Sequence, residues 1–319
     1  MGAPRTIYIA GAGIAGLTLA LALAKFGLHV VVLERNDSAS EFGAGLQISA
    51  NARKVLDNLG LSEAIAQKSF TPKGIEIFPD GREKPLQTLT LGKAIEKRFG
   101  APYAVMHRAD LLDVLHGAAR RFANIDIVFS VADFTLDGSG GGLTVSAQEP
   151  DGKQRKAKPF AFVGADGVRS VTRTRYLGGP DARYTGKVAW RALVAPEALS
   201  GVLDLGRTSL LLNPHFHLVV YPLPHRNAVN LALFTQEDER DLSVLDQRAP
   251  RVNPRKDSRL AHILESVGEG WTPWVLSSVE TPVWHKGPIG LIGDAAHAML
   301  PFQAQGAAMG IEDAAVLAP

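Results

Sequence analysis

The amino-acid sequence predicts an α/β fold in which a nucleotide-binding βαβ unit is interleaved with a second, sheet-rich domain. The first observation is a β-branched strand at Thr6–Ala10, followed by a glycine turn, an Ala- and Leu-rich helix at Ile14–Phe26 and a second strand at His29–Leu33. The second observation is a later series of runs that alternate apolar and polar residues, which predicts an antiparallel sheet. These runs are Val188–Val194, Ser209–Asn213, His217–Pro222 and Val229–Phe234.

Periodicity and turn residues indicate the remaining elements. Helices are expected at Asn51–Leu59, Leu61–Gln67, Ala109–Phe122 and Ala304–Leu317. Strands are expected at Ile75–Phe78, Leu86–Leu91, Ile125–Phe129, Phe160–Val163 and Gly290–Ile292, with a hairpin formed by Asp133–Leu136 and Leu143–Ala147. From this order, residues 1–68, 104–171 and 285–319 are assigned to the nucleotide domain, and residues 69–103 and 172–284 to the sheet-rich domain.

Composition excludes several function classes. The 319 residues carry a net charge of only +2, without a run of five basic residues, so no nucleic-acid partner is expected. The chain has no cysteine, which excludes disulfides, thiolate zinc sites and a cysteine nucleophile, and favours the cytoplasm. The apolar stretch Leu17–Ala24 is too short to span a bilayer, and a glycine turn interrupts any signal-peptide pattern.

The glycine turn Gly11-Ala12-Gly13-Ile14-Ala15-Gly16 has the Rossmann pattern of a dinucleotide site. Gly11 permits the tight turn, Gly13 allows backbone N–H groups to approach a pyrophosphate, and Gly16 allows the helix to pack against the strand. Glu34 ends the second strand, where a carboxylate can accept hydrogen bonds from a ribose hydroxyl. This motif alone does not distinguish FAD from NAD.

Three later segments distinguish them. Asp166-Gly167 follows a strand, Arg108 opens a helix, and a long closing segment runs from Gly293-Asp294 to Ala314. Together with the glycine turn, these segments resemble the single-component flavoprotein aromatic hydroxylases, typified by p-hydroxybenzoate and salicylate hydroxylases. The resemblance runs from residue 5 to the end of the chain, and the closing segment looks most like the salicylate and 3-hydroxybenzoate hydroxylase branch.

The resemblance implies a Rossmann-type FAD-binding domain and assigns contacts to individual residues. Asp294 would hydrogen-bond the ribityl chain, Arg108 would reach the ribityl–pyrophosphate region, and Arg35 would help hold the adenine end. Backbone N–H groups at the start of the last helix would stabilise negative charge on a reduced flavin. The further residues implied are Gly306, Ala307 and Ala308 near the ring, Pro301 against it, and Asp166 and Gly167 for both FAD and the NAD(P)H encounter.

The resemblance also implies the chemistry. NADH or NADPH reduces the flavin, molecular oxygen adds to form a hydroperoxyflavin, and one oxygen atom passes to a small aromatic acid or phenol. His217 is the candidate base for the phenol, Gln305 would share its hydrogen bond, and His215 is the close alternative. Arg191 and Tyr221 are candidates for binding the substrate carboxylate or ring, in a sheet-rich domain that would hold the substrate.

Other interpretations stay open at this stage. We expect His297 to be a structural neighbour of the flavin loop. His215 and His217 alternate along a predicted strand and could pair two metal ligands on one face, but no carboxylate or third histidine is evident near them, so no metal site is expected. An NAD-dependent dehydrogenase is the second function class, and a flavin-binding but catalytically impaired homologue is the third. Relatives usually continue past the point where this sequence ends at Pro319, and that further stretch covers the substrate domain. The oligomeric state is open, with a homodimer as one candidate.

Overall fold

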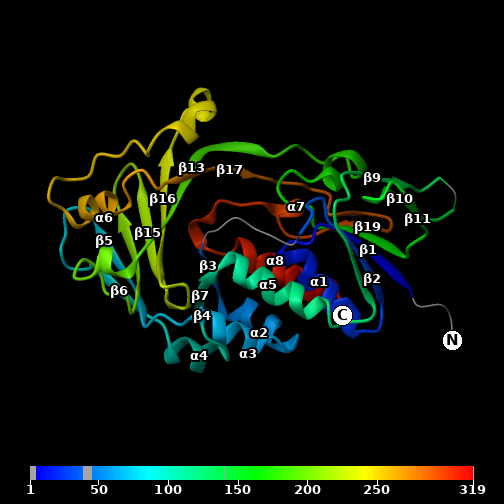
Figure 1. Ribbon diagram of the computed structural model, residues 1–319, viewed down its shortest axis with the longest axis horizontal. Helices are drawn as coiled ribbons and strands as arrows, with labels where there is room; N and C mark the ends of the chain where they lie inside the picture. Colours follow the sequence, from blue (N-terminus) through cyan, green and yellow to red (C-terminus); the bar gives the residue numbers. More distant parts are fainter. Residues whose placement is uncertain (1–4, 39–44, 140, 319) are drawn as a thin grey trace.

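A six-stranded sheet forms one end of the molecule in the computed structural model, which describes residues 5–38, 45–139 and 141–318 (Figure 1). The strand order is β18-β19-β12-β1-β2-β8, and neighbouring strands are parallel except for the antiparallel pair β18 and β19. The bounds are β18 His285–Lys286, β19 Ile289–Leu291, β12 Ala161–Gly164, β1 Thr6–Ala10, β2 His29–Leu33 and β8 Ile125–Val128.

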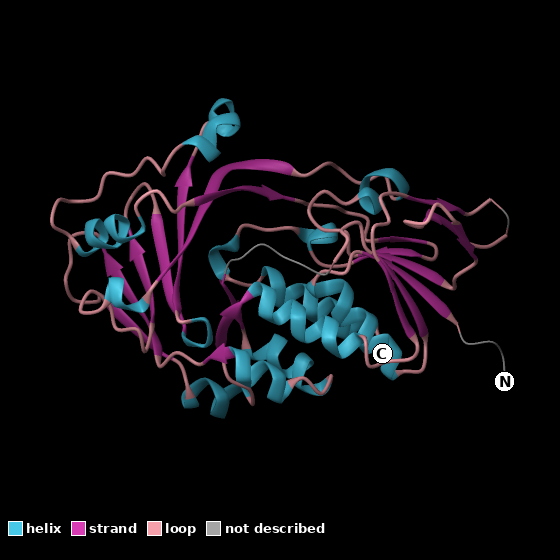
Figure 2. Cartoon of the chain, in the orientation of Figure 1, coloured by secondary structure: helices cyan, strands magenta, loops and turns pink. Residues whose placement is uncertain are grey.

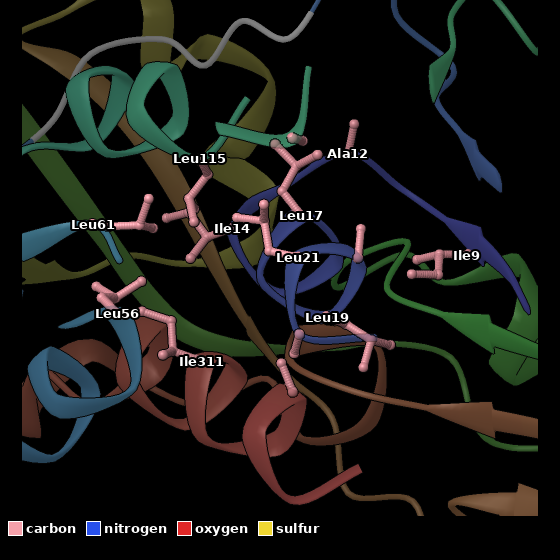
Figure 3. Close-up of a cluster of buried hydrophobic side chains, with 14 of the residues drawn as sticks. Ile9, Ala12, Ile14, Leu17, Leu19, Leu21, Leu56, Leu61, Leu115 and Ile311 are labelled. Carbon is pink, nitrogen blue, oxygen red and sulfur yellow. The ribbon is translucent and has the colours of Figure 1, made fainter. Parts of the chain in front are cut away.

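Both faces of this sheet are covered, as expected for parallel strands with continuous apolar sequence. Helices α1 (Ile14–Lys25), α5 (Arg108–Ala119) and α8 (Gly306–Leu317) contribute to the core on one face. The small antiparallel sheet β9 (Phe134–Asp137), β10 (Thr144–Gln148) and β11 (Gln154–Ala157) packs against the other. Figure 3 shows α1 at the centre of the helical side, where Leu17, Leu19 and Leu21 are fully or almost fully buried.

A seven-stranded sheet forms the opposite end of the molecule (Figure 2). Its neighbouring strands are antiparallel except for β14 and β5. Helix α6 (Arg259–Val267) packs on one face, where Trp190, Leu218 and Ile263 are fully buried. In order across the sheet, the strands are β17 Thr272–Ser278, β13 Arg183–Val194, β16 Ala228–Gln236, β15 His217–Leu223, β14 Thr208–Leu212, β5 Gly74–Pro79 and β6 Gln87–Thr90.

Short elements connect the two large sheets. A three-stranded sheet has the order β3-β7-β4 and lies between the helices and the seven-stranded sheet (Figure 1). Its strands are β3 Gly45–Ile48, β7 Ala104–His107 and β4 Ser69–Phe70. The remaining helices are α2 Ala50–Asn58, α3 Ser62–Lys68, α4 Lys93–Phe99, α7 Asp294–His297 and a π-helix at Thr172–Tyr176. The chain also forms 3-10 helices at η2 Pro196–Leu199, η3 Pro224–Arg226, η4 Glu239–Gln247 and η5 Pro301–Gln303.

The predicted α/β fold class is confirmed, and strands β1 and β2 have the predicted bounds. The predicted hairpin is present as the antiparallel pair β9 and β10. One detail is wrong: His215 does not alternate with His217 along a strand, because β15 begins at His217 and His215 lies in the preceding turn. The division of the chain into two domains stays a prediction.

The described residues show neither a membrane-spanning helix nor a metal-binding cluster. None of their helices is long and apolar enough to cross a membrane. Within the same ranges, no group of three or more His, Cys, Asp or Glu side chains could hold a metal ion.

Candidate active site

The carboxyl ends of β1, β12 and β19 meet at one edge of the six-stranded sheet, because these strands are parallel neighbours. The loops that leave this edge are therefore close together in space, although they are far apart in sequence. Backbone hydrogen bonds fix them to one another: the Ala165 N–H donates to the Ala10 carbonyl at 2.8 Å, and the Ile292 N–H donates to the Gly164 carbonyl at 3.0 Å. Ligands of open α/β sheets bind at this carboxyl edge.

The glycine turn after β1 has no room for side chains. Gly11 has φ +101°, and a Cβ there would lie 2.5 Å from the Ala165 carbonyl oxygen. A Cβ on Gly16 would lie 2.0 Å from the Gly11 oxygen, so the turn and α1 can pack only with glycine at both positions. Gly13 is the N-cap of α1. The turn thus presents backbone, rather than side chains, to the carboxyl edge of the sheet.

Glu34 holds this turn from within the chain. One carboxylate oxygen accepts a hydrogen bond from the Ala12 N–H at 2.7 Å, and the other accepts from the Asn36 N–H at 2.9 Å. The neighbouring Arg35 is exposed. The predicted contact of Glu34 with a ribose stays a prediction, and it must be made by a carboxylate that already bonds two backbone groups.

Asp166 likewise organises its own loop. Its carboxylate accepts hydrogen bonds from the Ser170 hydroxyl at 2.6 Å and from the Thr172 N–H at 2.9 Å. Gly167 has φ +75° and lines the cavity described below.

Arg173, which the sequence interpretation missed, is fully buried below the Asp166 loop. Its guanidinium donates to the carbonyl oxygens of Val168, Pro180 and Ala295 at 2.7 to 2.8 Å. Those carbonyls come from separate segments, so one side chain connects the loop after β12 with helix α7.

The loop after β19 is held by Asp313 of α8. Its Oδ2 atom accepts a hydrogen bond from the Gly293 N–H at 2.7 Å and lies 2.6 Å from Nε2 of His297. This hydrogen bond raises the pKa of His297. His297 also lies beside the Trp284 ring, with 5.0 Å between centroids. The contacts are those of a structural neighbour of the loop, whereas Asp294 is exposed and lines the cavity.

A cavity of about 730 Å³ lies between this edge and the seven-stranded sheet. Its size is typical of small-molecule and cofactor sites. Alternate residues of β14, β15 and β16 form one wall, because side chains on a strand point to opposite faces in turn. The opposite wall is formed by the glycine turn, by loops after β12 and β19, and by the start of α8.

Eleven of the predicted site residues line this cavity. They are Gly13, Ala15, Arg108, Arg191, Gly167, His217, Tyr221, Asp294, Pro301, Gly306 and Ala307. The other predicted residues are outside its lining: Gly11, Gly16, Glu34, Arg35, Asp166, His215, Gln305 and Ala308. Sequence reasoning missed the aromatic residues Phe234 and Phe302, which line it beside His217. The alternation along β16 could have identified Phe234, and the place next to Pro301 could have identified Phe302.

His217 is half-buried within an aromatic cluster. Its ring is stacked on Phe234 with 4.6 Å between centroids, and Phe302 meets it edge-on at 5.1 Å. Burial, and secondarily the charge of Lys187, lowers the pKa of His217. The imidazole is therefore neutral at pH 7 and can accept a proton.

The other predicted substrate residues have contrasting surroundings. Tyr221 is buried, and burial raises its pKa. The Arg191 guanidinium lies over the Trp274 ring at 4.9 Å from its centroid. His215 is exposed. Gln305 is the N-cap residue of α8, and its side-chain oxygen accepts a 3.4 Å hydrogen bond from the Ser49 hydroxyl.

The residues present fit FAD. The glycine turn would be filled by any Cβ at Gly11 or Gly16, and it leaves backbone N–H groups at the start of α1 for a pyrophosphate. The first turns of α1 and α8 contain no acidic residue, and residues at the start of both helices line the cavity, so the positive ends of both helix dipoles face it. Arg108 adds a cation to the same lining.

Known proteins resemble the chain along almost its whole length. A family model described as an FAD binding domain matches residues 5–319. The chain is 33% identical to 3-hydroxybenzoate 6-hydroxylase 1 of Aquipseudomonas alcaligenes, across 98% of this chain and 79% of that protein. It is 29% identical to the 6-hydroxynicotinate 3-monooxygenase of Pseudomonas fluorescens, across 98% of this chain and 81% of that protein.

Solved structures show the same fold. A tetrameric form of 2-methyl-3-hydroxypyridine-5-carboxylic acid oxygenase has a TM-score of 0.77 and 26% identity, with 99% of this chain and 82% of that chain covered. HpxO of Klebsiella pneumoniae, complexed with FAD and uric acid, has a TM-score of 0.81 at 20% identity, with 98% and 79% covered. The NAD-dependent dehydrogenase alternative is set aside, and the chain belongs to the FAD-binding family of flavin-dependent aromatic monooxygenases.

Proposed function

We propose that this enzyme hydroxylates a small aromatic acid or phenol of the hydroxybenzoate type, with molecular oxygen as co-substrate and NADH or NADPH as reductant. The observation that carries the proposal is the position of His217. It lies in the same cavity lining as Asp294, Pro301 and Gly306, on the wall opposite the nucleotide loops. FAD, when bound, supplies the oxygen-transfer chemistry.

The chain's own residues would then activate and orient the substrate. A phenolate is a better nucleophile than a phenol, so removing the hydroxyl proton favours attack by the ring on oxygen. The neutral imidazole of His217 is the acceptor that we propose for this proton. Gln305 could assist only if its side chain turned from Ser49 into the cavity.

Arg191 and Tyr221 are proposed to orient the substrate. Both line the same cavity as His217. A guanidinium can bind a carboxylate through two parallel hydrogen bonds, and the Trp274 ring beneath Arg191 limits its movement. Burial keeps Tyr221 protonated, so its hydroxyl can donate to a carboxylate or a phenolate oxygen. The apolar aromatic cluster around His217 would exclude water from the reacting ring.

The cofactor side is proposed to use Arg108, Asp294 and the start of α8, together with Glu34 and Arg35 toward the adenine end. Asp166 and Gly167 belong to the same proposal. Asp166 acts there through the loop that it holds, because both of its oxygens already accept hydrogen bonds.

The test is to purify the full chain, record its visible spectrum and follow NADH or NADPH oxidation with 3-hydroxybenzoate, salicylate and 6-hydroxynicotinate. We expect a flavin spectrum, faster oxidation with at least one of these acids, and a product with one added oxygen atom. A flavin-bearing protein whose NAD(P)H oxidation responds to no aromatic acid would instead be the catalytically impaired homologue. A protein that binds no flavin after reconstitution would contradict the proposal.

A further inference from the structure

A second cavity, of about 340 Å³, lies at the end of the seven-stranded sheet where β5 and β14 meet the start of α6. Figure 1 shows α6 and β5 at the end of the molecule farthest from the six-stranded sheet. Leu212 lines both this polar cavity and the active-site cavity, so the two adjoin through β14. Nothing in the proposed hydroxylation uses it.

The polar cavity contains an excess of cations. Four basic side chains line it, against three acidic ones. Among the residues that the structure describes, none of the four basic side chains forms an ion pair. The basic residues are Arg82, Arg255, Lys256 and Arg259, and the acidic residues are Asp80, Glu83 and Asp257. Unpaired cations around a concave site favour an anionic ligand.

Arg259 is held in place yet keeps a donor without a partner. Its guanidinium lies over the Phe78 ring at 4.4 Å from the centroid, and Nη2 donates to the Glu83 carbonyl at 2.6 Å. Its Nη1 atom is buried and has no hydrogen-bond partner within the described ranges. A buried donor without a partner is costly, and a carboxylate oxygen would satisfy it.

Asp80 provides the complementary group. Its Oδ2 atom accepts a 2.7 Å hydrogen bond from the Asn213 side chain, whereas Oδ1 is buried and has no partner in the described part of the chain. Asp80 and Arg259 do not form an ion pair with each other there. A single ligand with both an anionic group and a hydrogen-bond donor would satisfy both side chains.

We propose that the polar cavity is a second ligand site, which binds a small carboxylic acid that also carries a hydroxyl or amino group. The carboxylate accepts from Arg259 Nη1, with Arg82, Arg255 and Lys256 supplying the surrounding positive charge. The hydroxyl or amino group donates to Asp80 Oδ1.

Malate and succinate test this pairing, because both are dicarboxylates and only malate carries a hydroxyl group. Isothermal titration calorimetry is done on the FAD-loaded full chain at low ionic strength, where charge interactions are least screened. We expect saturable binding of malate and about tenfold weaker binding of succinate, the factor that one charge-assisted hydrogen bond provides. Absence of saturable malate binding up to about 20 mM, or equal affinity for both acids, overturns the proposal.

Variants assign the binding to this cavity. Arg259→Gln and the exposed Lys256→Gln should each weaken malate binding, while Arg251→Gln should not, because Arg251 is exposed, is paired with Asp241 and lies outside the lining. In Asp80→Asn, the side-chain oxygen stays with Asn213 and an amide N–H replaces the free acceptor, so the preference for malate over succinate should disappear. Equal effects of Lys256→Gln and Arg251→Gln would contradict the site.

A competition experiment shows in which of the two cavities malate binds. Malate is titrated again in the presence of saturating benzoate, an aromatic acid of the proposed substrate type that carries neither a hydroxyl nor an amino group and so lacks the donor for Asp80. Unchanged affinity is expected, because the proposed ligand groups lie outside the active-site lining. Loss of malate binding would place the acid in the active-site cavity and overturn the proposal. This readout does not depend on hydroxylation, so it can fail while the proposed function stands.

Discussion

At the residue scale, the acid–base property of His217 arises from packing rather than from an acidic partner. Phe234 and Phe302 surround the ring, and no carboxylate among the described residues hydrogen-bonds it. Burial disfavours the charged imidazolium, because that form loses hydration that aromatic rings replace poorly. The folded pKa therefore lies below the ordinary value of 6.5, and the base stays neutral to a more acidic pH than a free histidine.

His217→Ala should lower kcat/KM for hydroxylation about 100-fold, the lower range for loss of a general base. Flavin should stay bound, because His217 lies on β15 and not on the nucleotide loops. In the wild type, the acidic limb of kcat/KM against pH should lie below 6.5, since only the neutral imidazole accepts the proton. Steady-state kinetics with product analysis measures the fall in kcat/KM and the position of the acidic limb, and the visible spectrum shows whether flavin stays bound.

His215→Ala is the matched control for this prediction. His215 is two residues away, but it is exposed and outside the cavity lining, so turnover should stay near that of the wild type. If His215→Ala is the variant that loses activity, the base is His215. Wild-type turnover in both variants would remove both histidines from the proposal.

The role of a residue can be predicted from sequence when the contacts that fix it lie close to it along the chain or in one neighbouring strand. Gly11 and Gly16 are predictable because the clash that excludes a side chain arises within one turn and its neighbouring strand. Glu34 is predicted as a ligand contact, but its bonds to Ala12 and Asn36 depend on how the loop closes. Arg173 is not predictable, because its three carbonyl partners meet only after folding.

At the element scale, α7 and α8 are joined through Asp313, and this connection depends on pH. The hydrogen bond to Asp313 raises the folded pKa of His297 above the unfolded value of 6.5. A raised pKa means that the folded protein binds the proton more tightly than the unfolded chain. The resulting stabilisation is fully present below pH 6.5 and is lost as the pH rises through the folded pKa.

His297→Gln should therefore be less stable than the wild type by about 2 kcal/mol at pH 5.5, the value of a hydrogen bond to a charged group. The difference should narrow as the pH rises above 6.5. Thermal unfolding of both proteins between pH 5.5 and 9 measures it. His262→Gln, on the exposed surface of α6, is the control and should show no such trend. A difference that widens with pH would reverse the sign of the linkage.

Elements are predictable from sequence where burial leaves a pattern. Helix α1 is apolar on all sides because it is buried between the sheet and other helices, and its predicted start is correct. Helix α4 is missed because none of its residues is buried, so it has no apolar stripe. Strand β17 is missed because it forms the edge of its sheet and exposes Trp274 and Val275 in succession, which removes the alternation.

At the scale of the whole molecule, the two large sheets must keep a fixed separation for the cavity between them to hold its shape. Asp110 of α5 provides a direct connection. Arg226 donates two hydrogen bonds to its carboxylate at 2.8 and 2.9 Å, and His225 of the same 3-10 segment donates a third. Arg108, two residues away, lines the cavity. No periodicity in sequence could predict a pair more than a hundred residues apart, so the arrangement of the sheets required the structure.

Asp110→Ala should destabilise the protein by about 2 kcal/mol, because the buried carboxylate loses its charge-assisted hydrogen bonds, while the exposed Arg226 guanidinium stays hydrated. Burial by itself raises the pKa of Asp110, but hydrogen bonds from Arg226 and His225 lower it to about 2. The contribution is thus present above the ordinary pKa of 3.8 and is lost as the pH falls toward 2. Because α5 begins at Arg108, weaker FAD binding should accompany the loss.

Urea unfolding at pH 7 and pH 3, followed by circular dichroism and flavin fluorescence, measures these effects. Asp113→Ala is the matched control on the same helix: its carboxylate is 58% exposed and lies 3.8 Å from Lys68, so its removal should cost less than about 1 kcal/mol. At pH 3 the difference in stability between Asp110→Ala and the wild type should shrink. Below its ordinary pKa of 3.8, Asp110 of the unfolded chain binds a proton that the folded carboxylate binds only near pH 2, and this proton uptake favours the unfolded wild type. Equal destabilisation by the two variants at pH 7 would mean that Asp110 is an ordinary surface charge, and that the separation of the sheets is set by the β3-β7-β4 connection alone.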